Sequence, residues 1–151
     1  MIVVIDTNIL IDAWRDDFSY TRKIIDAIIS GEITAVASHK IWREYQTILD
    51  RLVNDQDHYD LAQRLFSAMD MVNVRSREKV VKYDPDDDKF FNCALDGEAE
   101  YIISNDSHLW EIGEYKGIKV KQPKDFWLEY EVQNRDGGEV WKDWMKQIMG
   151  R

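Results

Sequence analysis

The sequence predicts an α/β fold in which helices cover both faces of a central parallel sheet of about five strands, giving three layers. Two observations predict it. Short apolar runs of strand length alternate along the chain with longer segments in which apolar residues recur every three or four positions. Turn or helix-capping residues separate the two kinds of segment, as in repeated strand-helix-strand units with parallel strands.

The individual elements follow from these patterns and their end signals. The expected strands lie at residues 2–5, 33–37, 72–74, 101–104 and 118–120. The expected helices begin near residues 7, 21, 38, 57, 88 and 123. The capping residue Ser38 and the proline at position 123 are typical of helix starts. We expect residues 1–132 to form one compact domain, because a chain of 151 residues with 44% hydrophobic content can build one substantial core.

The end of the chain has a different pattern. Residues 133–151 are expected to be a linker followed by a short amphipathic helix, because a polar stretch ending in two glycines precedes apolar residues at helical spacing. Trp141 and Trp144 lie on this apolar face. Two tryptophans need a surface to bury against, so we expect the helix either to pack on its own domain or to form a homodimer or another partner contact.

Composition and charge limit the classes of function. No apolar run is long enough to span a membrane and no secretory leader is visible, so we expect a cytoplasmic protein with no membrane partner. Cys93 is the only cysteine, which excludes a disulfide within the chain and a cysteine-based zinc site. A net charge of -9 argues against general binding of polyanions, so any nucleic-acid site has to be local.

Acidic side chains at or near the ends of predicted elements are the main functional signal. They are Asp6, Glu44, Asp88 and Asp106. The carboxyl ends of parallel strands meet at one edge of an open sheet, where ligands bind, so acids from distant segments can share a pocket there. At about 5 Å separation each ionised pair repels by roughly 3 kcal/mol. A hard divalent cation such as Mg²⁺ or Mn²⁺ would offset that repulsion.

Basic residues lie near one of these acids. On the helix that begins at residue 38, Glu44 falls at the margin of the apolar stripe, a position that points toward a cleft. Lys40 and Arg43 flank it on the same helix, and a second basic group lies at residues 75–82. Both groups could guide a phosphate backbone, or could simply form solvated faces.

Four motifs, in order along the chain, carry a resemblance to a known family. They are V-V-I-D-T-N-I-L at the start, S-x5-E at the start of the third helix, then D-P-D-D-D-K-F, and finally Y-I-I-S-N-D. Over about residues 1–130 they together resemble the PIN-domain nucleases, and in particular the PIN toxins of bacterial and archaeal toxin-antitoxin systems.

The resemblance implies a set of site residues. The family's four acids fall on Asp6, Glu44, Asp88 and Asp106, and its hydroxyl and amide helpers on Thr7, Asn8 and Ser104. At the third acid the alternatives Asp84, Asp86 and Asp87 stay open, as replacements for Asp88 or as its assistants. We favour Asp88 because it directly precedes the apolar helix that begins K-F-F.

The resemblance also implies an activity and partners. The protein would be a metal-dependent endoribonuclease that cleaves single-stranded RNA, using Mg²⁺ or Mn²⁺ held by the four acids. Lys40 and Arg43 would contact the RNA. The enzyme would be the toxin of a toxin-antitoxin pair, with a cognate antitoxin protein as its partner.

Other classes of function remain to be weighed against this one. A catalytically silent PIN-like module would bind RNA or protein, but the presence of all four acids argues against it. An aspartate-dependent phosphatase usually needs a second acid two residues after the first, where this chain has Asn8. The three histidines match no metal or triad spacing, and we expect them to have surface or capping roles.

Overall fold

The structure, a computed structural model, describes residues 1–17, 19–134 and 145–149. Its central sheet has the strand order β3-β2-β1-β4-β6-β5. The elements are β1 (Ile2–Ile5), α1 (Thr7–Arg15), α2 (Tyr20–Ile29), β2 (Thr34–Ala37), α3 (His39–Leu52), α4 (Gln56–Ala68), β3 (Asp70–Met71), the 3-10 turn η1 (Pro85–Asp87), α5 (Asp88–Asp96), β4 (Tyr101–Ile103), α6 (Ser107–Trp110), β5 (Glu114–Tyr115), β6 (Ile118–Lys121) and α7 (Pro123–Asn134).

The order of strands places a topological switch point beside β1. The chain first builds outward from β1 through β2 to β3, then returns to add β4 and β6 on the other side of β1. All of these strands pair in parallel, and only β5 is antiparallel, to β6. Because the strand order reverses at the β1/β4 pair, a crevice is expected at the carboxyl ends of these two strands.

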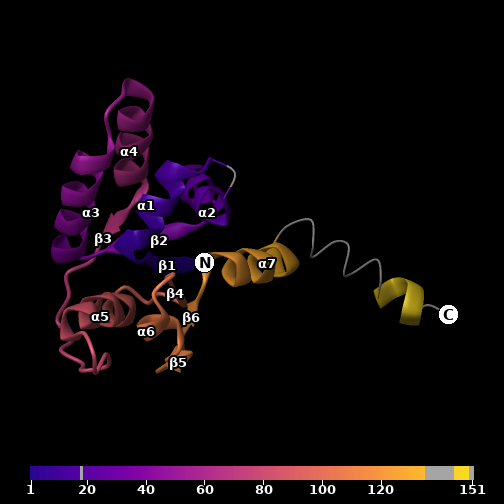
Figure 1. Cartoon of the computed structure of the whole chain (residues 1–151). Coiled ribbons are helices and arrows are strands. Elements are labelled where there is room, and N and C mark those ends of the chain that lie inside the picture. The colour runs from indigo at the N-terminus through magenta and orange to yellow at the C-terminus, as the bar shows by residue number, and fades with distance from the viewer. Residues whose placement is uncertain (18, 135–144, 150–151) are drawn as a thin grey trace.

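Helices cover both faces of the sheet, as predicted. Figure 1 shows α1 and α2 on one face and α5 and α6 on the other. α7 packs along α2, and α3 contacts both α1 and α5. The helix α3 therefore connects the two helical layers at the carboxyl edge of the sheet.

The core forms where the apolar runs of the sequence meet between these layers. Val3, Val4 and Ile5 of β1 are fully buried, as expected for a central parallel strand. Ile9 and Leu10 of α1 are fully buried against one face. Each such side chain contributes about 1.5–3 kcal/mol through removal from water. This rigid core fixes the position of the residue that follows β1, Asp6.

The sheet differs from the prediction at its two edges. It has six strands instead of about five, because a two-residue strand, β5, folds back on β6. Strand β3 is Asp70–Met71 and does not include residues 72–74, of which Val72 continues the pairing through one bond to Ala37 O. Both differences involve strands of two residues, which are too short to show a periodic pattern.

Parts of the predicted tail lie outside the described residues. Trp141 and Trp144 are among them, so their predicted burial remains a prediction. Residues 145–149 are helical, and Ile148 and Met149 are exposed. In the part of the chain that the structure describes, no helix is long and apolar enough to cross a membrane. Cys93 is a buried free thiol, as expected for a core cysteine.

Candidate active site

The site begins at Asp6, directly after the central strand. Its backbone N–H donates to Ile103 O at 2.9 Å, which extends the pairing of β1 with β4. The side chain is 6% exposed, and its Oδ2 accepts a hydrogen bond from Ser104 Oγ at 2.7 Å. Burial raises the pKa of Asp6, and the negative charges of Asp106 and Glu44 add to this, although the Ser104 bond opposes it. Asp6 is thus a buried acid close to two others.

Ser104 links Asp6 to the next acid along the sheet edge. This serine is fully buried at the end of β4, and its Oγ accepts the backbone N–H of Asp106 at 2.9 Å. The carboxylate of Asp106 also caps the short helix α6 by accepting the His108 N–H at 2.9 Å. One hydroxyl therefore fixes the acid after β1 and the backbone of the acid after β4.

Glu44 is brought to the same edge by α3. Tyr45, the next residue, is fully buried and its hydroxyl donates a hydrogen bond to the carbonyl oxygen of Ile5, which ties α3 to the end of β1. Thr7 Oγ1 then donates to Glu44 Oε1 at 2.6 Å. The predicted roles of Thr7 and Ser104 as hydroxyl partners of acids agree with these contacts. Tyr45 was not predicted to contribute.

A lysine that the sequence reasoning missed also enters the site. Lys89 Nζ lies 2.6 Å from Glu44 Oε2 and 2.6 Å from Asp86 Oδ2, and its side chain is 6% exposed. The other oxygen of Asp86 contacts Lys40 Nζ at 3.1 Å. Burial would lower the pKa of Lys89, but the hydrogen bonds to Asp86 and Glu44 outweigh it and raise the pKa. The lysine is held as an ammonium.

Asp88, the acid that the sequence favours at the third position, binds backbone N–H groups in the structure. Its Oδ1 accepts the backbone N–H groups of Val80 at 2.9 Å and Val81 at 2.7 Å. These bonds hold the preceding segment against the start of α5. One carboxylate oxygen of Asp88 therefore holds the backbone, and the role of Asp88 as an acid of the site stays a prediction beside the alternatives Asp84, Asp86 and Asp87.

Asp87, directly before Asp88, differs from it in its surroundings. Its side chain makes no capping bond at the start of α5. Burial raises its pKa to about 7, and the negative charges of Asp84, Asp6 and Asp106 contribute to the increase. Asp6 and Asp106 can act on Asp87 only if the carboxylates are near one another. The alternative that the sequence left open, Asp87 in place of Asp88, is the one we adopt.

The donor set suits a hard divalent cation, although the carboxylates are not gathered around one point. Asp6, Asp87 and Asp106 supply only oxygen atoms and repel one another, which is the chemistry that Mg²⁺ or Mn²⁺ would relieve. Within the described ranges, no three His, Cys, Asp or Glu side chains already stand in an arrangement that could hold a metal ion. Binding would require these side chains to turn toward a shared ion.

Two predicted residues lie less centrally than expected. The side chain of Asn8 is exposed, and it is the backbone of Asn8 that hydrogen-bonds to the Asp6 carboxylate. Arg43 is exposed on α3 one position before Glu44. Lys40, by contrast, contacts Asp86 beside the acids. Of the predicted RNA contacts, Lys40 is therefore the one next to the candidate site.

A groove of a size typical of ligand sites lies beside Lys40. Its volume is about 480 Å³, and it runs over the carboxyl ends of β2 and β3. The basic residues Arg77 and Lys79 line it together with Lys40, Asp86 and Lys89. Lys40 from the basic group on α3 therefore lines the same groove as Arg77 and Lys79 from the group at residues 75–82.

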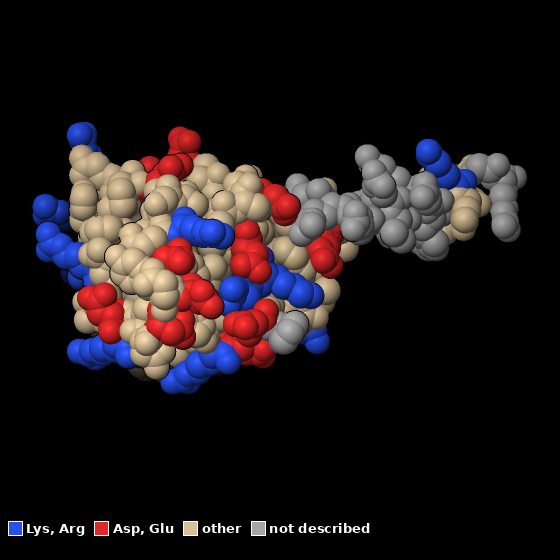
Figure 2. All heavy atoms as spheres, turned by 90° about the horizontal axis from the view of Figure 1, so that it is seen from above, with Lys and Arg blue, Asp and Glu red and all other residues tan. Residues whose placement is uncertain are grey.

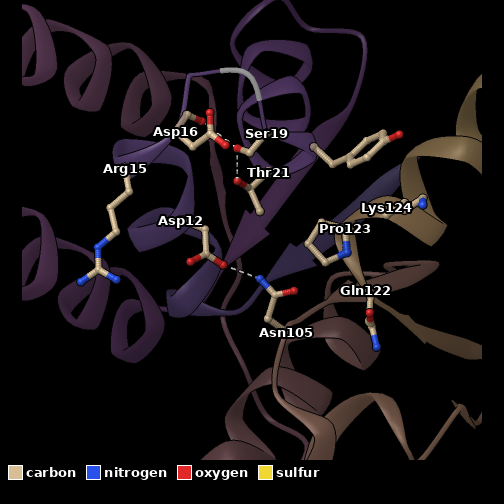
Figure 3. Close-up of a pocket in the computed structure, with 10 residues that line it drawn as sticks. Asp12, Arg15, Asp16, Ser19, Thr21, Asn105, Gln122, Pro123 and Lys124 are labelled. Carbon is tan, nitrogen blue, oxygen red and sulfur yellow. Dashed lines mark hydrogen bonds between the residues drawn. The ribbon is translucent and has the colours of Figure 1, made fainter.

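A second hollow lies over the other half of the sheet edge, at the carboxyl ends of β4 and β6. Its volume is about 370 Å³. Figure 3 shows Asp12 and Asn105 pointing toward each other and joined by a hydrogen bond, with Gln122 and Pro123 next to Asn105. Since Asn105 lies between Ser104 and Asp106 in the chain, this hollow adjoins the acids from the side opposite to the basic groove.

Surface charge agrees with a local site for a polyanion. In Figure 2, acidic and basic side chains are interspersed over the face shown, and no continuous basic surface crosses it. The net charge of the chain is -9. At the candidate site, the cations available to a phosphate include Lys40, Arg77 and Lys79, which line the groove.

The fold and the site together define an α/β domain with buried acids at the switch point of a parallel sheet. The chain belongs to the PIN-domain family: the sequence profile of the PIN domain matches residues 2–108, which include Asp6, Glu44, Asp87 and Asp106. PIN domains are generally nucleases. The predicted resemblance and the predicted fold are thereby confirmed.

Individual relatives support the same fold. An uncharacterized protein of Methanocaldococcus jannaschii is 28% identical over 142 residues, covering 85% of this chain and 91% of that protein. A chain in the crystal structure of VapBC2 from Rickettsia felis, bound to a DNA fragment from their promoter, is similar with a TM-score of 0.55. At 12% identity, that likeness covers 81% of this chain and 98% of the other, and it concerns the fold alone.

Proposed function

We propose that this protein is a divalent-metal-dependent endoribonuclease that cleaves single-stranded RNA and serves as the toxin of a toxin-antitoxin pair. The observation that carries the proposal is the buried link from Asp6 through Ser104 to Asp106, at the switch point of a PIN domain. Burial raises the pKa of Asp87 to about 7 and the charges of Asp6 and Asp106 contribute to the rise, which supports Asp87 as a third acid of the same site. Mutually repelling carboxylates are the usual ligands of Mg²⁺ or Mn²⁺ in such a site.

Each residue of the site has a separate proposed role. Asp6, Asp87 and Asp106 would hold the cation, which when bound lowers the pKa of water and neutralises charge on a phosphodiester. Ser104 orients the Asp6 carboxylate, and Thr7 orients Glu44, through the hydrogen bonds already described. Burial raises the pKa of the Cys93 thiol to about 12, so this thiol is not a nucleophile at neutral pH.

The two hollows support cleavage within a strand. One lies over β2 and β3 and the other over β4 and β6, with the acids of β1 and β4 between them. A strand that crosses the acids could therefore continue on both sides of the scissile phosphate. Lys40, Arg77 and Lys79 would contact phosphates on one side. A single strand fits such a path because its bases can be turned outward or stacked individually.

The toxin role and the antitoxin partner rest on similarity. The sequence motifs resemble PIN toxins, and the fold resembles a chain of VapBC2, which was crystallised on DNA from its promoter. Exposed apolar residues at the end of α7, Leu128 and Val132, together with Ile148 and Met149 of the tail, could supply a surface for a partner or for a second copy.

The test is cleavage of a labelled single-stranded RNA by the purified chain. We expect cleavage with Mg²⁺ or Mn²⁺, none with EDTA, and weaker or no cleavage of a duplex of the same sequence. Asp6→Asn should reduce the rate by about 100-fold or more, because it removes the central buried ligand. The same variant should keep the circular dichroism spectrum of the wild type.

A contaminating nuclease is the main rival explanation for activity. Asp50→Asn, which changes an exposed acid on α3, provides a matched control that should cleave at the wild-type rate. If Asp6→Asn and Asp50→Asn cleave equally fast, or if activity survives EDTA, the metal-dependent mechanism is wrong.

A further inference from the structure

An exposed pair of aromatic rings, Tyr83 and His108, lies outside the hydrophobic core. Their ring centroids are 5.5 Å apart, with an angle of 42° between the ring planes. Tyr83 is 83% exposed, against 52% for Tyr59, and His108 is exposed as well. A single exposed ring is ordinary on a protein surface, so the position of this pair decides what it can do.

His108 is tied to the acid that follows β4. Its backbone N–H donates to Asp106 Oδ1 at 2.9 Å, and the backbone N–H of Asp106 donates to Ser104 Oγ at 2.9 Å. The same serine hydroxyl donates to Asp6 Oδ2 at 2.7 Å. A short series of hydrogen bonds therefore leads from the acid after β1 to the backbone of His108. Because the capping bond uses only the backbone, the imidazole is left to contact Tyr83.

Tyr83 is held from both sides along its own segment. Two residues before it, the backbone N–H of Val81 donates to Asp88 Oδ1 at 2.7 Å. Directly after it, Asp84 Oδ1 accepts the backbone N–H of Asp86 at 3.2 Å, at the start of the turn η1. The backbone that carries the ring is thus anchored before any ligand binds, so little ordering of this segment opposes binding.

Tyr83 also continues the lining of the basic groove along the chain. It lies between Lys79 and Pro85, both of which line that groove together with Lys40. Proteins that bind single strands combine cations along the phosphate backbone with aromatic rings on which bases stack. The net charge of -9 repels a polyanion, and stacking adds affinity that does not depend on charge. The groove and the ring therefore suit the two parts of a nucleotide.

We propose that Tyr83, supported by His108, stacks on an unpaired base of a single-stranded RNA whose backbone passes the acids. His108 packs on one side of the tyrosine ring, and the base packs on the ring surface that is open to solvent. Every base has a π-face, so this contact selects unpaired bases and not a sequence. The inference rests on the proposed function, because it assigns a base-binding residue to the same site. It gives His108 a role beyond the surface or capping role expected from the sequence.

The experiment measures binding of two labelled strands of equal length by fluorescence anisotropy, with Mg²⁺ present. One strand is an oligoadenylate RNA, and the other has the same sugar-phosphate backbone without bases. Full-length Asp6→Asn is the parent protein, so that neither strand is cleaved. Adding Tyr83→Ala should weaken binding of the strand with bases by about 10-fold, and binding of the abasic strand by less than about 2-fold.

Three further variants of this parent separate stacking from other effects. Tyr83→Phe keeps the ring and should bind both strands as the parent does. His108→Ala keeps the backbone N–H that Asp106 accepts, and it should weaken binding of the strand with bases only. Tyr59→Ala removes another exposed tyrosine, on α4, and should change neither affinity. Because Tyr83 is so exposed, Tyr83→Ala should keep the melting temperature of the parent.

The outcomes distinguish this contact from the nuclease activity. Equal losses on the two strands in Tyr83→Ala would show that the tyrosine affects the phosphate path and not a base, and would overturn the proposal. So would an unchanged affinity in Tyr83→Ala, a loss in Tyr83→Phe as large as that in Tyr83→Ala, or binding of neither strand by the parent. If wild-type protein fails to cleave RNA but base-dependent binding through Tyr83 holds, the stacking contact stands and only the catalytic function is wrong.

Discussion

Ser104 joins Asp6 to the backbone of the second strand-end acid. Its Oγ donates to Asp6 Oδ2 at 2.7 Å and accepts the Asp106 N–H at 2.9 Å, with no exposure to solvent. The single hydroxyl hydrogen is used on Asp6, so the direction of both bonds is determined. The acids after β1 and β4 therefore hold a fixed relation before any ligand binds.

Ser104→Ala should consequently weaken the site without disturbing the fold. We expect Mn²⁺ affinity or cleavage rate to fall by about 10- to 100-fold, as for other groups that orient metal ligands. Calorimetry and RNA cleavage measure the two effects. Ser107→Ala, an exposed serine on α6, is the matched control and should behave as the wild type. Wild-type affinity and rate in Ser104→Ala would show that the hydroxyl does not orient Asp6.

Asp87 and Asp88 are adjacent, yet their substitution should have opposite effects. Asp87→Ala should abolish cleavage and leave the melting temperature unchanged or higher, because it removes a repelled carboxylate. Asp88→Ala should retain cleavage at low temperature but lose about 1–3 kcal/mol of stability, since the N–H groups of Val80 and Val81 lose their acceptor. Denaturant unfolding and cleavage assays measure these changes.

An amide provides the control for this pair. Asp88→Asn keeps an oxygen that can accept from Val80 and Val81, so it should be more stable than Asp88→Ala and should still cleave RNA. Loss of cleavage in folded Asp88→Asn together with full activity in Asp87→Ala would restore Asp88 as the third acid of the site.

Asp87 should also make the metal-free protein less stable as the pH rises. Its pKa is about 7 in the folded chain, raised by burial and by nearby acids, against 3.8 for a free side chain. Between these values the folded state binds more protons than the unfolded state, so the free energy of unfolding falls as the pH rises from about 4 to about 7. Above about pH 7 the Asp87 side chain lowers the free energy of unfolding no further.

The melting temperature of Asp87→Asn, measured in EDTA, should therefore exceed that of the wild type by an amount that grows between pH 5 and pH 8. A difference of a few degrees is expected, since about 1 kcal/mol corresponds to roughly 2–4 °C for a chain of this size. Asp50→Asn should show no such growth. A difference between Asp87→Asn and the wild type that is constant with pH would mean that Asp87 is not a repelled, buried acid.

The fold could be predicted because its signals are local. The continuous run of β1 and the capping serine of α3 each act within a few residues, and the structure has both elements where expected. The sequence prediction misplaces β3 and misses β5, because a strand of two residues is too short to show the alternation of apolar and polar residues. For β5 the sequence did carry a signal in Gly117, because glycine is favoured in tight hairpin turns, and in the structure Lys116 and Gly117 both have positive φ.

The site could be predicted only in part, for a physical reason. Acids that follow strands, such as Asp6 and Asp106, are placed by the sheet itself, so their positions follow from the strand ends. The choice between Asp87 and Asp88 depends on which carboxylate meets the N–H groups of Val80 and Val81, a contact made by tertiary folding. The pairing of Lys89 with Glu44 joins α5 to α3 and has no local signal in the sequence.

The tail is expected to affect association and not catalysis. A chain that ends after Asn134 keeps all of α7 and every acid of the site, so it should cleave RNA at the wild-type rate. It lacks the tail in which Ile148 and Met149 are exposed, 53% and 75% respectively. Because exposed apolar side chains at helical spacing favour association, we expect the truncated chain to differ from the wild type in mass or in binding of the antitoxin.

Light scattering on both proteins, alone and with antitoxin, measures this effect. A full-length chain carrying Ile148→Ser and Met149→Ser separates the apolar contacts of the tail from its mere length, and it should reproduce the change seen on truncation. If the truncated chain instead loses stability at unchanged mass, the tail packs on its own domain, since burial of its apolar face then contributes to the fold. Unchanged mass, melting temperature and antitoxin binding would show that the predicted amphipathic face has no binding surface, and that residues 133–151 take no part in the association of the domain.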